Sequence, residues 1–161
     1  MLTVGSLAPE IESNDQHGRP FRLSEQEHRL CTVIYFFPKA FTPGCTRETE
    51  TFRDNYSELR LAGAALAGVS TDDPTTQCKF AASLKAEFPM LADHKGEIAK
   101  AYDVRWPLIG IAQRVTYIVG PGQRILCAFH HELRIQRHRD DVLAFVDGLY
   151  LARQRALAPR S

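Results

Sequence analysis

The sequence has 161 residues, of which 44% are hydrophobic and 24% charged, and its formal net charge is +1. This length and composition are those of one globular domain with a hydrophobic core. The near-zero net charge excludes a strongly basic chain of the kind that binds nucleic acid or anionic membranes. No apolar stretch is long enough to cross a bilayer. The N-terminus lacks the charged and apolar segments of a signal peptide, so we expect a cytoplasmic protein.

The N-terminal residues 1–29 are predicted to form short extended segments around a turn. Residues 10–12 and 21–23 alternate between polar and apolar side chains, and Gln-His-Gly-Arg-Pro between them is typical of a turn. Residues 30–37 follow as a mostly apolar run. Such a run indicates a central strand that is covered by helices on both faces.

The middle of the chain alternates between helix and strand patterns. Apolar residues recur at helical spacing over 45–62, and Gly63 is expected to end that helix. Residues 64–69 are predicted to form a second buried strand, and the order strand, helix, strand indicates a parallel unit. The next helix begins with Asp-Pro, which suits the N-cap and the first helical position, and we expect it to cover 73–87.

The last part of the chain adds a hairpin and a helix. A short helix is expected over 96–102, and residues 114–119 and 124–129 are predicted to pair as antiparallel strands around Gly-Pro-Gly-Gln. An apolar stripe marks a final helix from about residue 139, and residues 152–161 are expected to form a flexible tail. The pattern predicts one domain over all 161 residues, with a mixed sheet and helices on both faces.

Cys45 has a distinctive position in this pattern. It follows the predicted strand over 30–37 through a turn with the sequence Pro-Lys-Ala-Phe-Thr-Pro-Gly, which places it at the start of a helix. Unpaired backbone N–H groups and the helix dipole favour negative charge there, and they stabilise the thiolate, which is the reactive form of cysteine. We therefore predict that Cys45 is a nucleophile rather than a buried packing residue.

The residues around Cys45 resemble the active-site motif of the peroxiredoxins. Pro38, Thr42 and Cys45 have the spacing Pro-x-x-x-Thr-x-x-Cys, and the longer string Phe-Pro-Lys-x-Phe-Thr-Pro-Gly-Cys-Thr-x-Glu is similar to the bacterioferritin comigratory protein (PrxQ) branch. The resemblance extends from about Gly5 to about Leu149. It implies a thioredoxin-like α/β fold and a thiol-dependent peroxidase that reduces hydrogen peroxide and organic hydroperoxides, with no metal, flavin or haem cofactor.

The resemblance also implies roles for residues near the nucleophile, with Cys45 as the peroxidatic cysteine. Thr42 would direct its hydroxyl into the same pocket, and Pro38 would stiffen the turn and limit water near the sulfur. Arg114, in Arg-Val-Thr-Tyr-Ile, matches the second active-site arginine of the family. Its guanidinium would stabilise the thiolate and donate to the peroxide oxygen. Glu48 is expected to orient an arginine in the substrate pocket, and an acidic residue that only favours the helix start is the alternative.

Cys78 is predicted to be the resolving cysteine. A sulfenic acid on Cys45 must react with a second thiol, or it risks over-oxidation. In one PrxQ subgroup this thiol lies five residues after the first, where the present chain has Glu50, and in the other subgroup it lies on the next helix, about where Cys78 falls. At about 100° per residue, Cys78 lies off the apolar face of its helix, so we expect its thiol to be exposed.

A disulfide between Cys45 and Cys78 is expected to need local unwinding. The two residues lie near the starts of different helices, and a disulfide needs Cα atoms within about 7 Å. Thioredoxin or a similar dithiol would then reduce the disulfide. Two other interpretations stay open: a one-cysteine peroxidase that uses an external thiol such as glutathione, and a non-enzymatic redox-sensing binding protein.

The remaining candidates are interpreted as structural. The spacing of the four cysteines fits no zinc site, so Cys31 and Cys127 are assigned to the core, with Cys127 as the fallback resolving residue. Three histidines lack a defined set of metal ligands and are interpreted as surface residues: His130, His131 and His138.

Two aromatic residues and the oligomeric state are left undecided by the sequence. Trp106 and Phe41 either line the approach to Cys45 or pack in the ordinary way. The resemblance is compatible with a monomer or a weak homodimer.

Overall fold

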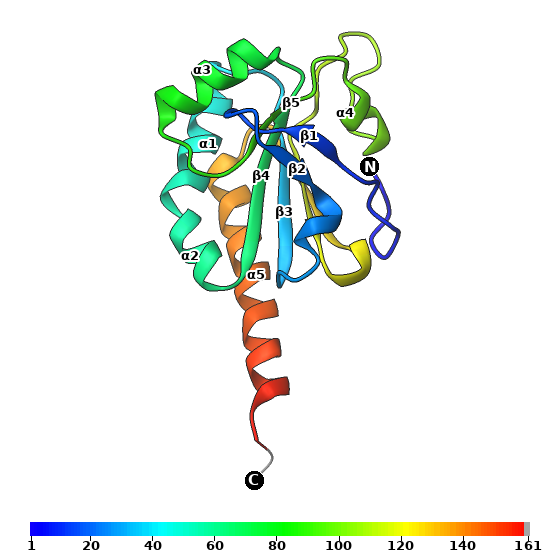
Figure 1. The fold of residues 1–161 in the computed structure, drawn as a ribbon, viewed down its shortest axis with the longest axis vertical. Helices are drawn as coiled ribbons and strands as arrows, with labels where there is room; N and C mark the ends of the chain where they lie inside the picture. The colour runs from blue at the N-terminus through cyan, green and yellow to red at the C-terminus, as the bar shows by residue number, and fades with distance from the viewer. Residues whose placement is uncertain (160–161) are drawn as a thin grey trace.

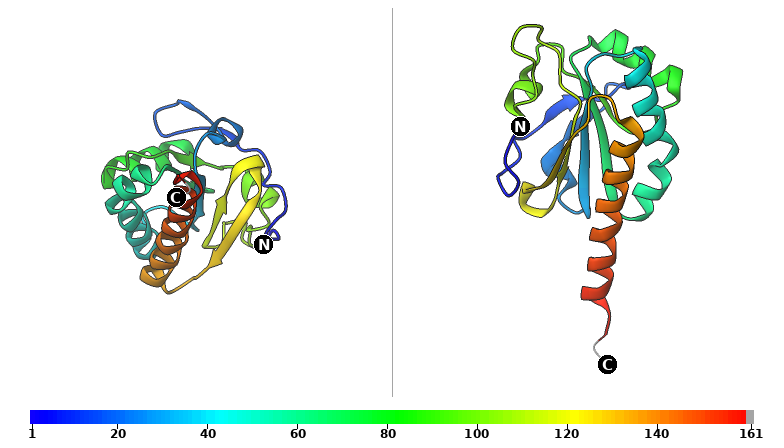
Figure 2. Two further views of the ribbon diagram at one scale, coloured as in Figure 1. Left: turned by 90° about the horizontal axis from the view of Figure 1, so that it is seen from below. Right: turned by 180° about the vertical axis from the view of Figure 1, so that it is seen from behind.

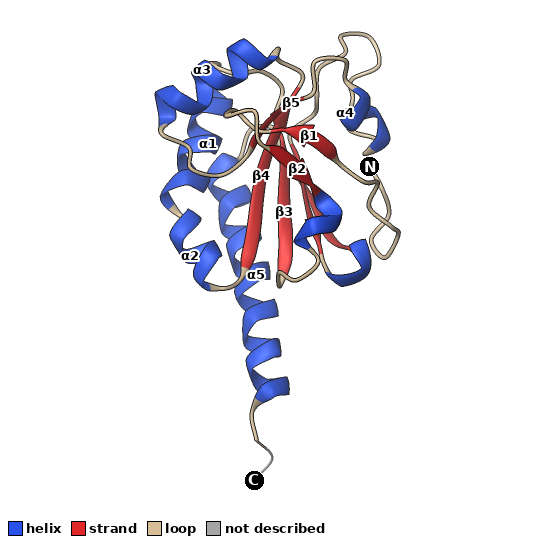
Figure 3. Cartoon of the chain, viewed as in Figure 1, coloured by secondary structure: helices blue, strands red, loops and turns tan. Residues whose placement is uncertain are grey.

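The computed structural model describes residues 1–159, which fold around a mixed sheet of five strands (Figures 1 and 3). The elements in chain order are β1 (Glu12–Asn14), β2 (Pro20–Arg22), the 3₁₀ helix η1 (Leu23–Gln26), β3 (Cys31–Phe36), α1 (Pro43–Asp54), α2 (Tyr56–Leu61), β4 (Ala64–Ser70), α3 (Pro74–Leu84), β5 (Met90–Ala92), α4 (Glu97–Ala101), β6 (Val115–Val119), η2 (Pro121–Gln123), β7 (Ile125–His130) and α5 (Ile135–Leu157). The strand order is β5-β4-β3-β6-β7, with β3, β4 and β5 parallel and β6 antiparallel to both of its neighbours.

The central strand β3 separates two hydrophobic cores, because its side chains alternate between the faces of the sheet. Val33 and Tyr35 pack with residues of α1, α2, α3 and α5. Ile34 and Phe36 pack on the other face with residues of β2, η1 and α4. Figure 2 shows the two layers from below and from behind. The predicted α/β fold, with a mixed sheet and helices on both faces, is confirmed.

Both predicted hairpins are present, with ends that differ by one or two residues from the predicted ones. The N-terminal segments pair as β1 and β2, and the later pair forms β6 and β7, with a register irregularity between Ile118 and Val119. The strands β3 and β4 also lie where the apolar runs predict them.

Two helices end earlier than the sequence pattern predicts. The helix expected over 45–62 is interrupted at Asn55, whose side chain donates to the Thr51 carbonyl at 2.7 Å, and the chain continues as α2. The helix expected to reach Glu87 ends at Leu84, because Lys85 adopts a left-handed conformation with φ of 53°. This turn brings the chain back toward the sheet, where Phe88 is fully buried.

The last helix, α5, is longer than predicted at both ends. It begins at Ile135 instead of residue 139. The apolar stripe places the start too late because a polar residue, His138, occupies the buried face one turn before it. It continues to Leu157, so residues 152–157 are helical, and it projects beyond the sheet in Figure 1. Residues 160 and 161 of the predicted tail lie outside the described residues. Although α5 has 23 residues, no helix within residues 1–159 is apolar enough over sufficient length to cross a membrane.

A pair of glycine substitutions tests the packing between β3 and β4. A Cβ atom at Gly68 would lie 2.6 Å from Tyr35 Cζ and 2.9 Å from Met90 Sδ, so Gly68→Ala overpacks this core. We expect it to lower the free energy of unfolding by about 1–3 kcal/mol in a urea titration. Gly148→Ala is the control, because the Cβ site there is open and the residue lies within α5. This change should stabilise the fold by about 0.5–1 kcal/mol. Equal stability of the two variants would contradict the packing described.

Candidate active site

Cys45 lies in the first turn of α1, beyond the C-terminal end of β3. Thr42 is the N-cap residue in extended conformation, and Pro43 occupies the first helical position. Backbone N–H groups in a first turn have no helical acceptor, so they present partial positive charge near the sulfur. The residue is only 1% exposed. A thiolate at this position is therefore shielded from bulk water and faces the positive end of the helix.

Arg114 comes from a different part of the sheet, immediately before β6, and points at the same sulfur. Its Nη2 lies 3.5 Å from Cys45 Sγ, and its Nη1 donates to Glu48 Oε1 at 2.7 Å. On its other side Nε donates to the Glu132 carbonyl, and the Arg114 backbone N–H donates to Glu132 Oε1. The guanidinium is therefore held by two groups, the Glu48 carboxylate and the Glu132 carbonyl, which directs Nη2 toward the sulfur. The structure places the guanidinium of Arg114 beside Cys45, and its role in the reaction stays a prediction.

Glu48 contacts this arginine from one turn further along α1. Both side chains are buried, at 1% and 7% exposure for Glu48 and Arg114. Burial raises the pKa of Glu48 to about 7, and the positive charge of Arg114 opposes that shift. Burial alone would lower the pKa of Arg114, but the charges of Glu48 and Cys45 raise it overall. The arginine therefore stays charged while it faces the sulfur.

The turn that precedes α1 is fixed by its own hydrogen bonds. Thr42 Oγ1 donates to the Lys39 carbonyl at 2.7 Å, and the Ala40 N–H donates to Asp72 Oδ2 at 2.8 Å. The Thr42 hydroxyl thus closes the turn in this structure, and its predicted contact with substrate stays a prediction. Pro38 is partly buried at the start of the same turn.

Phe41 and Trp106 both carry exposed aromatic surface. Phe41 is 53% exposed, has a φ of 66°, and packs edge-on against Phe80 of α3 at 5.2 Å between ring centroids. Trp106 is 39% exposed and lies in the loop between α4 and β6. Phe41 therefore links the turn before Cys45 to α3.

Comparison with known proteins identifies the family to which this site belongs. The AhpC/TSA family matches residues 4–127. The chain belongs to this family. Chloroplastic peroxiredoxin Q of Sedum lineare is 32% identical over 149 residues, which cover 92% of the chain and 80% of that protein. The chain is therefore a peroxiredoxin, as the motif around Cys45 predicts.

Solved structures place the peroxiredoxin in the PrxQ branch. The crystal structure of peroxidoxin BcpB from Mycobacterium tuberculosis is similar, with a TM-score of 0.84, 31% identity and coverage of 99% of this chain and 100% of that one. Peroxiredoxin Q of Xanthomonas campestris has a TM-score of 0.80 and 27% identity, with coverage of 87% and 91%. The fold is thus thioredoxin-like, and the protein is a thiol peroxidase of the PrxQ and bacterioferritin comigratory protein branch.

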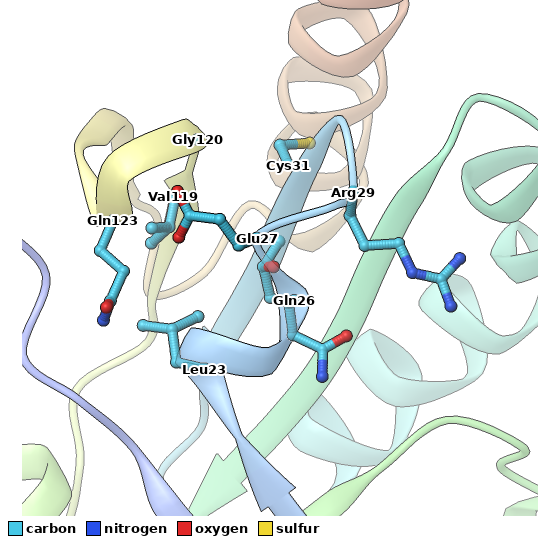
Figure 4. Close-up of a pocket in the computed structure, with 9 residues that line it drawn as sticks. Leu23, Gln26, Glu27, Arg29, Cys31, Val119, Gly120 and Gln123 are labelled. Atoms are coloured by element: carbon cyan, nitrogen blue, oxygen red, sulfur yellow. The ribbon is translucent and has the colours of Figure 1, made fainter.

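The other three cysteines of this peroxiredoxin differ in exposure, and none is in a disulfide. Cys78 is exposed, as its helical position predicts, whereas Cys31 is buried and Cys127 is partly buried. Burial raises the pKa of Cys31 to about 12 and also raises the pKa of Cys127. Cys31 borders a cavity of about 10 Å³ at the opposite end of β3 from Cys45 (Figure 4). That volume is about that of one water probe, too small for a substrate site.

The interpretation of His138 as a surface residue is wrong. The side chain is 1% exposed, its Nε2 is hydrogen-bonded to Thr116 Oγ1, and the same atom lies 3.8 Å from Glu48 Oε2. Burial lowers the pKa of His138 to about 4, with contributions from nearby positive groups. The signal for its burial is spacing, because His138, Val142 and Val146 recur every four residues on one face of α5.

The neighbouring histidines lie nearer the surface: His130 is exposed and His131 is partly exposed. Within residues 1–159, no three His, Cys, Asp or Glu side chains come together as a possible metal site.

The buried ion pair predicts that a second substitution at Glu48 recovers the stability lost in an Arg114 variant but not its reactivity. Arg114→Gln leaves Glu48 buried without its cation, so we expect the free energy of unfolding to fall by about 3–5 kcal/mol. The double variant Arg114→Gln/Glu48→Gln should recover most of that loss in a urea titration. Its Cys45 should still react with hydrogen peroxide on the order of a hundredfold more slowly than the parent in stopped-flow measurements, since the charged donor is missing. If the double variant reacts as fast as the parent, Arg114 has no role in the reaction of Cys45 with peroxide.

Proposed function

We propose that the Cys45 thiolate attacks one oxygen of hydrogen peroxide or a small organic hydroperoxide. The S–O bond forms as the O–O bond breaks, so Cys45 becomes a sulfenic acid and the leaving oxygen takes a proton to give water or an alcohol. The observation that carries this proposal is the Arg114 guanidinium, fixed by Glu48 and placed 3.5 Å from Cys45 Sγ. A charged donor so close to the sulfur supports both the thiolate and the negative charge that develops on the peroxide.

Resolution is assigned to Cys78 in the same proposal. Its thiol attacks the sulfenic sulfur of Cys45, which forms a disulfide and releases water. Three observations support this choice: Cys78 is exposed, it lies on α3, and α3 contacts α1 directly. Cys31 is disfavoured because it is buried at the far end of β3, and Cys127 because it is partly buried and burial raises the pKa of its thiol. Cys127 remains the fallback.

The start of α1 is the expected place of opening when the disulfide forms. Cys45 is buried on α1 and Cys78 is exposed on α3, so we expect one of the two to move before their sulfurs meet. The N-terminus of α3 is well anchored, since Asp73 Oδ1 accepts from the Thr76 N–H at 2.7 Å and Gln77 Nε2 donates to the Leu91 carbonyl at 2.8 Å. The N-cap residue of α1, Thr42, accepts no hydrogen bond from the N–H groups of the helix, and its hydroxyl donates to the Lys39 carbonyl instead. We therefore assign the unwinding to α1.

Recycling by thioredoxin or a similar dithiol completes the proposed cycle. Cys78 borders an open hollow of about 400 Å³ that is also lined by Gln16, Arg19 and Lys85. An external thiolate could reach a disulfide at Cys78 from this side, which would release Cys45 in reduced form. A monomer or weak homodimer and a cytoplasmic location stay part of the proposal.

Peptide mapping by mass spectrometry after one equivalent of hydrogen peroxide tests both cysteine roles. The parent and the control Cys127→Ser should give a Cys45–Cys78 crosslink. The variant Cys78→Ser should accumulate sulfenic or sulfinic acid on Cys45 and lose turnover with thioredoxin. Turnover of this variant with glutathione would favour a one-cysteine peroxidase. A slow reaction with a stable mixed disulfide would favour a redox sensor, and an unmodified Cys45 would refute the proposal.

Hydrogen exchange tests where the chain opens. The disulfide form should exchange backbone amides faster than the reduced form over residues 46–48, because unwinding breaks their hydrogen bonds to the carbonyls four residues earlier, such as that from Thr46 N–H to the Thr42 carbonyl. Residues 76–84 of α3 should keep most of their protection. Unchanged protection in α1, or greater loss in α3, would contradict the assignment.

A further inference from the structure

The buried ion pair leaves one polar atom without a partner. Glu48 Oε1 accepts from Arg114, but Glu48 Oε2 has no hydrogen bond although the residue is only 1% exposed. Among residues 1–159, two buried side-chain polar atoms have no hydrogen-bond partner: Glu48 Oε2 and His138 Nδ1. A buried carboxylate oxygen without a donor is costly, so its surroundings matter for the charge state of Glu48.

We propose that His138 is a positioning residue of the peroxidatic site, whose neutral imidazole presents Nε2–H to Glu48 Oε2 and keeps the carboxylate ionised and turned toward Arg114. The proposal rests on the proposed role of Cys45 and adds α5 to a site built from α1 and the start of β6. The Nε2–Oε2 distance of 3.8 Å is longer than a hydrogen bond, and a small rotation of either side chain would shorten it. His138 thus acts through Glu48 and Arg114.

The hydrogen-bond arrangement favours this tautomer. Nε2 lies against Thr116 Oγ1 and faces the carboxylate, whereas Nδ1 has no partner. A protonated Nε2 places its hydrogen between a hydroxyl oxygen and a carboxylate oxygen, which both accept. A bare Nε2 would instead place its lone pair toward the Glu48 carboxylate and leave a buried Nδ1–H without an acceptor. The first arrangement avoids both costs.

The charges around the pair set the direction of the pH dependence. Besides burial, the charges of Arg114 and Glu132 act on Glu48. The groups that act on His138 are His131, Arg114, Asp141 and His130. Burial raises the pKa of Glu48 to about 7 and lowers that of His138 to about 4. The imidazole is therefore neutral at the pH where Glu48 titrates. A donor to a carboxylate lowers its pKa, so removal of His138 should move protonation of Glu48 to higher pH.

The consequence for the reaction follows from the Arg114 contacts. Once Glu48 is protonated, Arg114 loses the charged partner that holds Nη1 at 2.7 Å, while its bonds to Glu132 remain. The guanidinium is then free to shift away from Cys45, and a shift of about 1 Å is enough to slow a reaction strongly. The acidic limb of the rate profile should therefore follow the ionisation of Glu48.

Stopped-flow rate constants for hydrogen peroxide, measured against pH, test the proposal in the full chain. His138→Leu should react about tenfold more slowly at pH 7. As the pH is lowered, its rate should begin to fall at a higher pH than that of the parent. His138→Gln places an amide donor near the Nε2 position and should restore most of the rate. Val142→Ala is the matched control for packing of α5, because Val142 is fully buried one turn later. It should lower thermal stability without moving the acidic limb.

The Glu48→Gln variant, which lacks the carboxylate, tests whether His138 acts through Glu48. In Glu48→Gln, the further change His138→Leu should not move the acidic limb, because there is no carboxylate left to ionise. An equal shift in both backgrounds, or an unchanged limb in His138→Leu, would overturn the role of His138.

A second readout keeps this test separate from the proposed peroxidase role. The ¹³C signal of the Glu48 carboxyl group should titrate at higher pH in His138→Leu than in the parent, whether or not Cys45 reacts with peroxide. A Glu48 titration that does not change would refute the positioning role. Failure of the parent Cys45 to react with peroxide would refute the proposed function alone.

Discussion

The ion pair between Arg114 and Glu48 is the interaction on which the site depends. Its partners are 66 positions apart in the sequence and join α1 to the start of β6. A buried ion pair is weak support for stability, because desolvation of both charges offsets much of their attraction. Its contribution here is geometric. With Nη1 on the carboxylate and Nε on the Glu132 carbonyl, the guanidinium plane is fixed and Nη2 faces the sulfur.

The aromatic core beneath α1 gives this arrangement a rigid base. Tyr35 of β3 stacks on Phe52 of α1 at 4.6 Å between ring centroids, and its hydroxyl lies 3.1 Å from Thr49 Oγ1, one residue after Glu48. Sheet and helix are therefore connected on the buried face by both packing and a hydrogen bond. The first turn of α1, by contrast, has no side-chain cap. The helix combines a fixed body with an uncapped first turn that carries Cys45.

The sequence was sufficient for features that depend on local patterns. The strands, the placement of Cys45 at a helix start and the exposure of Cys78 follow from periodicity and turn residues, and the resemblance to the family points to Arg114. What it could not supply depends on tertiary structure. Lys85 ends α3 in a left-handed conformation that usually favours Gly or Asn, so no residue type signals it. The surface interpretation of His138 rests on its polar side chain. Its four-residue spacing from Val142 and Val146 indicates the buried face, but its contact with Thr116 of β6 depends on tertiary structure.

The long sequence separation within the site has a consequence for biosynthesis. During translation the chain emerges from its N-terminus, so Cys45 and Glu48 leave the ribosome well before Arg114, and before the segment that becomes α5. A nascent chain that ends before β6 contains Cys45 without the guanidinium that lies 3.5 Å from its sulfur in the complete fold. If Arg114 has the role proposed above, reactivity toward peroxide would depend on completion of the fold, and an incomplete polypeptide would carry a less reactive cysteine.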